Sequence, residues 1–436
     1  MSARSGAMLV AASMIGTGVF TTTGFLIRDL GSPAAVLIGW LIGGLLAFFG
    51  ASAYAELSAA LPHNGGEYQL LGRIYHPSFG FVAGWASMIV GFAAPTAACA
   101  LAFGHYLSRA VPGAPAGALA IGLLLVLSIL HATRVEHGAR WQDLLTFMKL
   151  ALIGVFIAGG GWAADLAYLT PPDARPLGES LASPSFALGL IYISFAYSGW
   201  SAAVYIAGEL RDPAKSVPRA LLGGTALVTA LYTALNLIFL ASAPSSALSG
   251  VLEVGHVAAE ALFGATASRL FSLLIALGLI STTGALLMTG ARVIEAMGRD
   301  YPVLSRFAAR PSDRGPQAAI ALLGVLALGM AVSATFDALL TYIGVTLALG
   351  NALTVVGVLV LRRREPELPR PYRTLGYPFT PILFSAMTTW VIVQSVRERP
   401  LVALVSGGTL AAGAFTWLLI RPTPKSRVEL GKDGRP

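Results

Sequence analysis

Charged side chains are scarce in this sequence. They make up 11% of its 436 residues, against 56% hydrophobic residues, and the mean hydropathy is +0.73. Soluble domains carry roughly 25% charged residues, because these side chains cover the surface that faces water. The scarcity therefore excludes a water-soluble fold and indicates an all-α integral membrane protein.

Cysteine and clustered metal ligands are also lacking. Cys99 is the single cysteine, which excludes a disulfide framework and a cysteine-based metal cluster; we expect it to be a small buried hydrophobe. His105 and His131 have no carboxylate or second histidine at ligand spacing. We therefore expect no metal site and no cofactor.

A basic patch interleaved with aromatic residues is missing too, although the net charge is +8. The lysines and arginines fall instead in short loops between apolar runs. This distribution argues against a nucleic acid partner and relates the basic residues to membrane topology. The lipid bilayer is thus the first partner that the sequence predicts.

Twelve apolar runs are long enough to cross a bilayer, which takes about 20 residues each. They occupy roughly residues 6–27, 33–60, 79–107, 116–132, 141–163, 185–207, 219–243, 268–297, 316–334, 336–361, 378–396 and 400–420. The loop between the ninth and tenth runs is the shortest, Ser333 to Thr335. No soluble domain remains between these runs.

The basic residues set the orientation of these runs. If the N-terminus is cytoplasmic, 22 of the 29 lysines and arginines lie inside, six lie outside and Lys149 lies within a span. The positive-inside rule then predicts a multi-pass protein of the cytoplasmic (inner) membrane with both termini in the cytoplasm. Residues 421–436 read as a disordered cytoplasmic tail.

The first span is weakened at its middle by Gly16, Thr17 and Gly18, within "SMIGTGVF". An unpaired peptide group in hydrocarbon costs several kcal/mol, so such an interruption requires a reason. For this span alone, close packing of glycines against a neighbouring helix is an alternative. A second weak point, Ser198 and Gly199, lies at the middle of the sixth span, 181 residues after Gly18, and favours a paired site.

Spans one and six begin two sets of five, and an odd number of spans makes the second set cross the membrane in the opposite direction. This arrangement predicts an inverted repeat: residues 1–163 form the first unit, residues 185–364 the second, and residues 378–420 two further helices. A broken helix exposes N–H groups at the start of one half and C=O groups at the end of the other. Two such breaks predict a site for the carboxylate and ammonium groups of an α-amino acid.

Five stretches in order along the chain resemble the amino acid, polyamine and organocation (APC) transporter superfamily. They are "MIGTGVF", "YAELSAALPHNGGEYQLL", "FAYSGWSAAVYIAGELRDPAKSVPRAL", "GARVIEAMGRDYPVL" and "RPYRTLGYPFTPIL". The resemblance covers nearly the whole chain and implies a LeuT-type fold of five plus five inverted spans, with helices one and six broken, plus two C-terminal helices.

The same resemblance implies roles for residues at the two breaks. Gly16, Thr17 and Gly18 would contact the substrate carboxylate, and carbonyl groups just before each break would face the ammonium. Phe195 stands where the family has an aromatic gate, whereas we expect Trp200 to pack. The full set of expected substrate-binding residues is Ser13, Met14, Ile15, Gly16, Thr17, Gly18, Phe195, Ala196, Tyr197, Ser198, Gly199 and Ser201.

Lys149 is the only lysine within a span, and a charge at the bilayer centre costs about 2.5–3.5 kcal/mol. Snorkelling to the interface is the alternative, but Lys149 lies nine residues beyond Arg140, roughly 13.5 Å along a helix. By resemblance to sodium-independent APC transporters, its ammonium would replace a sodium ion, touching span-one carbonyls and a hydroxyl of Ser281, Thr282 or Thr283. A buried ammonium that exchanges its proton would also make Lys149 a candidate proton carrier.

The residues around the breaks are neutral, which favours a neutral amino acid of small to medium size. Proton symport and exchange both stay open. A sensor that binds without transport, or an exchanger of polyamines or cationic amino acids, are the alternatives; a channel or a membrane enzyme lacks the pore ring or catalytic cluster it needs. We expect Glu56 and Glu209 at cytoplasmic span ends, where they either cap a helix or form ion pairs with Arg211 and Lys215.

Overall fold

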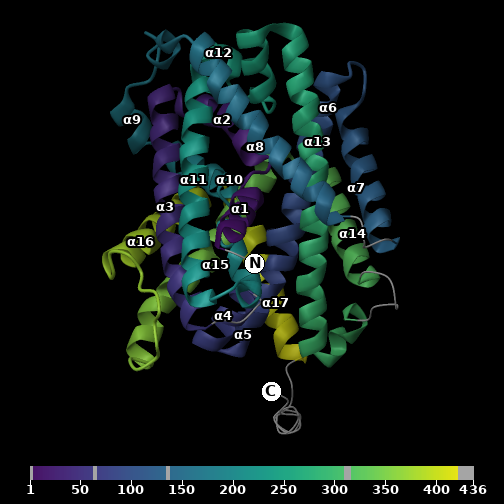
Figure 1. Ribbon diagram of the computed structural model, residues 1–436, viewed down its shortest axis with the longest axis vertical. Coiled ribbons are helices and arrows are strands. Elements are labelled where there is room, and N and C mark those ends of the chain that lie inside the picture. The colour runs from purple at the N-terminus through teal and green to yellow at the C-terminus, as the bar shows by residue number, and fades with distance from the viewer. Residues whose placement is uncertain (1–2, 62–65, 134–137, 309–315, 421–436) are drawn as a thin grey trace.

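The computed structural model describes residues 3–61, 66–133, 138–308 and 316–420, without the side chains of 138–144, 146 and 206–209. Within these ranges the chain is helical and has no strand. Most of the long helices run along the long axis of the molecule, side by side in one bundle (Figure 1). The tail expected at residues 421–436 lies outside the described residues.

Seven helical segments are long and apolar enough to cross a membrane. They are α3 (Pro33–Ala60), the continuous run of α5 (Pro77–Ala86), η1 (Ser87–Ala93) and α6 (Ala94–Ala110), α11 (Pro213–Leu240), α13 (Val254–Asp300), α15 (Phe336–Arg364), α16 (Phe379–Glu398) and α17 (Pro400–Ile420). One broken pair, α1 (Ala3–Met14) and α2 (Gly18–Leu30), passes the same test with a bend of 45°. These lengths are those of a multi-pass membrane protein.

Shorter apolar helices complete the bundle. They are α7 (Ala116–Thr133), α8 (Gly138–Ala163), α10 (Pro184–Ala196) and α14 (Gln317–Ser333). The connections carry α4 (Gly66–Ile74), η2 (Leu166–Leu169), α9 (Leu177–Ala182), η3 (Ala202–Glu209), α12 (Ser245–Leu248) and η4 (Pro302–Phe307). Each of the twelve apolar runs predicted from the sequence thus falls on helical structure.

Three local features differ from the expectation. The segment after the second span forms helix α4 rather than a loop, and the third span contains a π-helical turn, η1. Helix α13 begins at Val254 rather than near residue 268, because two helices meet at a kink at Gly264, where φ is 83°. In contrast, α14 ends at Ser333 and α15 begins at Phe336, where Thr335 accepts a hydrogen bond from the Ala338 N–H, so the predicted short boundary is confirmed.

Helix α11 packs along both α1 and α3, and α13 packs along α6. Three buried aromatic rings join α3 to α10 and α11: Trp40 lies 5.8 Å from Tyr197 and 5.6 Å from Tyr232, between ring centroids. This arrangement places α1 and α10, the two helices that end at the breaks, against one aromatic core.

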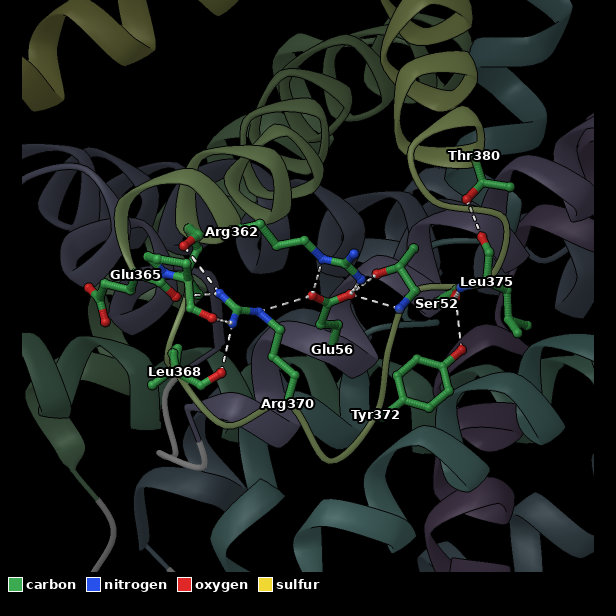
Figure 2. Close-up of polar contacts among 12 residues, drawn as sticks. Ser52, Glu56, Arg362, Glu365, Leu368, Arg370, Tyr372, Leu375 and Thr380 are labelled. Atoms are coloured by element: carbon green, nitrogen blue, oxygen red, sulfur yellow. Dashed lines mark hydrogen bonds and ion pairs between the residues drawn. The ribbon is translucent and has the colours of Figure 1, made fainter.

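Glu56, near the end of α3, is the centre of a charged network at one end of the bundle (Figure 2). Its carboxylate is 2% exposed and accepts two hydrogen bonds from the Arg362 guanidinium, at 2.8 and 2.7 Å. The backbone N–H of Thr374 donates to the same carboxylate at 2.7 Å, and Arg370 Nε lies 3.5 Å away. The expected partners of Glu56, Arg211 and Lys215, are therefore wrong, because the sequence does not show which distant arginines the fold brings near.

The network ties the segment between α15 and α16 onto α3. The Leu375 N–H donates to Ser52 Oγ at 2.9 Å, and the Tyr372 hydroxyl lies 2.9 Å from the same oxygen. Arg370 also donates to the carbonyl oxygens of Glu365 and Leu368, at 2.8 and 2.7 Å, beyond the last turn of α15. Helices α3 and α15 are thus held together where both end.

Replacing Glu56 with glutamine is expected to destabilise the protein by about 3 kcal/mol, because the half-buried Arg362 and Arg370 lose the counter-charge of a buried carboxylate. The melting temperature of the purified protein in detergent should fall by several degrees. Glu365→Gln is the matched control, since Glu365 pairs with Arg73 at an exposed site. Equal melting temperatures for the two variants would contradict the role given to Glu56.

Candidate functional site

The first break interrupts the helix between α1 and α2. The Ile15 N–H still bonds to the Ala11 carbonyl at 3.0 Å, but the Gly16 N–H turns back to the Met14 carbonyl at 2.8 Å, so the helical ladder stops. At the start of α2, the first N–H groups have no acceptor within the helix. Thr17 Oγ1 is buried and has no hydrogen-bond partner within the described part of the chain. The break therefore presents hydrogen-bond donors.

The second break separates α10 from the 3₁₀-helix η3, with Tyr197 to Ser201 between them. The Ser198 N–H bonds to the Phe195 carbonyl at 2.9 Å, a tightened turn that ends the helix. Gly199 has φ 98°, in the left-handed region that glycine occupies without strain. The Tyr197 N–H bonds to the Ile193 carbonyl at 2.9 Å, so the turn after α10 takes up some of the last carbonyl groups of the helix.

The two breaks lie against each other. A Cβ atom on Gly18 would lie 2.4 Å from the Cα of Ala196, and one on Gly199 would lie 2.6 Å from the carbonyl oxygen of Ser13. Both distances are far below van der Waals contact, so glycine alone fits at each position. The start of α2 meets the end of α10, and the end of α1 meets the turn after α10.

The remaining expected residues differ in exposure. Phe195 is 5% exposed and Met14, Ile15 and Thr17 are buried, whereas Gly16, Ser198 and Ser201 are partly exposed and Ser13 is exposed. The Tyr197 side chain points into the aromatic core, where its hydroxyl donates to the Trp40 carbonyl at 3.1 Å. Trp200 packs against Tyr54, with ring centroids 4.6 Å apart, as expected for a packing residue. Tyr197 therefore has its backbone, rather than its side chain, at the break.

Lys149 of α8 reaches the first break from the side. It is 5% exposed, and its ammonium donates to the Ile15 carbonyl at 3.0 Å and to Thr282 Oγ1 of α13 at 3.1 Å. The Thr282 hydroxyl donates its own proton to the Gly278 carbonyl at 3.2 Å, so its oxygen is free to accept from Lys149. Of the three hydroxyl groups considered, Thr283 bonds instead to the Leu279 carbonyl, and Ser281 makes no contact with Lys149.

The sequence analysis did not predict the roles of two tyrosines near the first break. The Tyr232 hydroxyl of α11 donates to the Met14 carbonyl at 2.6 Å, and the Tyr106 hydroxyl of α6 donates to the Phe20 carbonyl at 2.6 Å. A tyrosine in an apolar helix reads as a packing residue; the only signal is that its buried hydroxyl needs a partner. The carbonyl oxygens around this break are thus largely supplied with protein donors.

A cluster of charged and hydroxyl groups around Asp337 contacts both α2 and α10. Asp337, at the start of α15, accepts hydrogen bonds from the Tyr192 hydroxyl at 2.6 Å and from Arg399 at 2.9 Å, and Arg28 of α2 lies 3.9 Å away. This cluster joins the half-helices of both breaks to α15.

His105 has a partner that its position in the sequence does not show. Its Nδ1 lies 3.0 Å from Glu253 Oε1, and Arg109 lies 3.6 Å from the same oxygen. Burial raises the pKa of Glu253, whereas the hydrogen bond with His105 and the charge of Arg109 lower it. The lowering effects are larger together, so the pKa of Glu253 lies below its ordinary value. No group of three potential metal ligands occurs among the residues that the structure describes, and Cys99 is a buried free thiol.

A helical bundle whose membrane-length helices include a pair broken at mid-length is the architecture of a multi-pass membrane protein. The family model of amino acid permeases matches residues 2–412. The chain therefore belongs to the amino acid permease family, within the APC superfamily, which the sequence motifs indicated. This is a family of transporters rather than enzymes.

Characterised relatives match over most of their length. The chain is 29% identical to the serine/threonine exchanger SteT of Bacillus subtilis, over 88% of each protein. It is 28% identical to the human large neutral amino acids transporter small subunit 2, over 94% of this chain and 78% of that protein. It is 26% identical to the human b(0,+)-type amino acid transporter 1, over 91% and 82%.

Replacing Gly18 with alanine is expected to force α2 and α10 apart, because the added methyl group has no room against Ala196. Overpacking of this kind costs about 1–3 kcal/mol, which thermal unfolding of the purified protein measures. Gly122→Ala in α7 is the control, since a Cβ there meets nothing within 4 Å, and it should be neutral or stabilising. A Gly18→Ala protein as stable as Gly122→Ala would refute the close contact of the two breaks.

Proposed function

We propose that the chain is a secondary active transporter of neutral amino acids that binds its substrate between the two breaks and works by alternating access. One observation carries this proposal: the start of α2 and the end of α10 are in direct contact, with no room for a Cβ on Gly18. N–H groups in the first turn of α2 and carbonyl groups at the end of α10 therefore lie close together, as the two charged ends of an α-amino acid require.

In this proposal the substrate carboxylate binds the N–H groups at Gly16, Thr17 and Gly18 together with the Thr17 hydroxyl, which lacks a protein partner. The positive end of the α2 helix dipole favours the same charge. The ammonium group binds carbonyl oxygens at the ends of α1 and α10, from Ser13 to Ile15 and from Phe195 to Ser198. Phe195 covers the bound substrate, and Gly199 and Ser201 border it.

We further propose that the helices form the LeuT-type arrangement of two inverted five-helix units, residues 1–163 and 185–364, followed by the helices within 378–420. The protein then resides in the cytoplasmic membrane with both termini inside, as the distribution of basic residues favours. Alternating access follows from one unit moving against the other around the fixed site.

Sodium independence is proposed from the position of Lys149. Its ammonium contacts a carbonyl oxygen of the first break and a hydroxyl of α13. A bound sodium ion would seek those oxygen ligands, and a fixed ammonium already supplies the positive charge there. The same contacts allow Lys149 to act as a proton carrier, with Thr282 rather than Ser281 as its hydroxyl partner.

Exchange of small neutral amino acids is the favoured mode. Thr17, Phe195, Ser198 and Ser201 carry no charge that would select a charged side chain. The printed names of two relatives, a serine/threonine exchanger and a large neutral amino acids transporter, support neutral substrates, and the first supports exchange. Proton symport is the second candidate, because Lys149 carries a titratable proton at the site.

Counterflow tests this function. Proteoliposomes loaded with unlabelled serine are expected to take up labelled serine from outside without sodium, whereas liposomes loaded with buffer should take up little. A panel of other neutral, cationic and acidic amino acids outside, as competitors, defines the specificity. Uptake that needs a sodium gradient would overturn sodium independence, and binding without flux for every amino acid would overturn transport in favour of a sensor.

Lys149→Met is expected to lower serine exchange at least tenfold. The substitution removes charge-assisted hydrogen bonds to Ile15 and Thr282, each worth about 1.5–3 kcal/mol when buried. Lys215→Met is the matched control, because the Lys215 side chain is 71% exposed and pairs with Asp212, which is exposed as well. Full exchange activity in a folded Lys149→Met protein would rule out the coupling role.

A further inference from the structure

A cavity lies away from the two breaks, between α4, α5, α15 and α17. These helices meet at the lower end of the bundle in Figure 1, where α4, α5 and the end of α17 lie together. The cavity has a volume of about 420 Å³, within the range of small-molecule sites. Its walls are mainly apolar and include Leu71, Phe79, Val82, Leu353, Leu410 and Trp417.

One acidic side chain, Glu67 at the start of α4, enters this apolar lining. Glu67 is 9% exposed, and its Oε1 accepts a hydrogen bond from the Tyr54 hydroxyl at 2.7 Å. Its Oε2 lies toward Gly350 of α15, 3.4 Å from the position of a Cβ there, and no ion pair joins Glu67 to a lysine, arginine or histidine among the residues that the structure describes. A carboxylate in an apolar lining without a cation is costly, so this position favours a positively charged ligand.

The neighbours of Glu67 supply hydroxyl groups but no positive charge. The Tyr54 hydroxyl lies between Glu67 Oε1 and the side-chain amide of Asn351, at 2.7 and 3.0 Å, and Ser78, Ser87 and Thr346 line the same cavity. On the apolar side, Trp417 Nε1 is buried and has no hydrogen-bond partner within the described ranges. The acidic end of the cavity therefore has no cation among the described residues.

We propose that this cavity binds an amphiphile with an ammonium head group, whose nitrogen donates to Glu67 Oε2 and whose apolar body lies against α5, α15 and α17. The ammonium donates a hydrogen bond to Glu67 Oε2 and supplies the positive charge that Glu67 lacks. The apolar walls limit the access of water to this ion pair. An aminophospholipid of the surrounding membrane and a free amphiphilic amine share this chemistry.

The cavity is connected to the second break. Tyr54, which holds Glu67, packs edge-on against Trp200, the residue after Gly199, with ring centroids 4.6 Å apart. A ligand that binds the Glu67 carboxylate therefore changes the hydrogen bonding of Tyr54, which packs beside the second break. This regulatory consequence rests on the proposed transport function, whereas binding at Glu67 does not.

Photolabelling tests the binding directly. The probe is a ten-carbon primary alkylamine with a diazirine at its tail, applied to the protein in phosphatidylcholine nanodiscs, and labelled residues are mapped by mass spectrometry. Labelling is expected on the cavity walls at Leu71, Leu353 or Leu410, and the neutral N-acetylated probe should label these positions at least tenfold less. Equal labelling by both probes would overturn the proposal, because a protonated Glu67 or a purely apolar cavity does not distinguish them.

Two variants separate a specific site from loss of folding. Glu67→Gln should reduce amine labelling about tenfold, while Glu365→Gln, at an exposed glutamate, should leave it unchanged. Ala414→Trp fills the cavity from α17, away from Glu67, and should abolish labelling with an unchanged melting temperature. Labelling at the wild-type level in either folded cavity variant would refute the site.

The lipid composition of the nanodiscs shows whether the bound amine is a membrane lipid or a free amine. If nanodiscs that contain phosphatidylethanolamine protect the cavity from the probe, the occupant is the membrane lipid; if they do not, it is a free amine. Serine counterflow in the same lipids then reports the regulatory link. Labelling without serine transport would support the site and count against the transport function, so the two proposals fail separately.

Discussion

The peptide groups of an interrupted helix must find partners in a membrane, and this requirement governs the centre of the molecule. At the first break the carbonyl groups obtain them from three different helices. Tyr232 serves Met14, Lys149 serves Ile15 and Tyr106 serves Phe20. The Met14 and Ile15 carbonyl groups lie at the end of α1 and the Phe20 carbonyl lies in the first turn of α2, so side chains of α6, α8 and α11 converge on one short segment.

The partners at this break are unequal, and that inequality has a functional meaning. Carbonyl oxygens receive protein donors, whereas the Thr17 hydroxyl has no hydrogen-bond partner among the described residues, and the Gly18 and Val19 N–H groups begin α2 without an acceptor in that helix. A site with satisfied acceptors and unsatisfied donors attracts an anion. Because the α10 carbonyl groups lie beside it, the anion that fits is one that carries an ammonium a few ångströms away, which describes an α-amino acid rather than a simple carboxylate.

The sequence predicted those features that depend on composition and on local weakness. Apolar length gave the helices, and glycines at Gly16, Gly18 and Gly199 marked both breaks. Partners distant in the sequence could not be read, because packing chooses them: Tyr232 for Met14, Arg362 and Arg370 for Glu56, Glu253 for His105. The family resemblance directed attention to a hydroxyl of α13 beside Lys149, but not to which of three successive hydroxyl groups faces it. The apolar setting of Glu67 was equally invisible, since four helices build it.

Helix α15 takes part at both ends of the bundle, and this limits which elements are able to move. At one end Arg362 binds Glu56 of α3, and at the other Asp337 binds Tyr192 of α10 and, through Arg28, approaches α2. Both acids accept short hydrogen bonds, Glu56 from Arg362 at 2.7 Å and Asp337 from Arg399 at 2.9 Å, but the Glu56 side chain is 2% exposed and the Asp337 side chain 20%. Ion pairs near water are weaker than buried ones that are fully hydrogen-bonded. Separating α15 from α3 therefore costs more than separating α15 from α2 or α10.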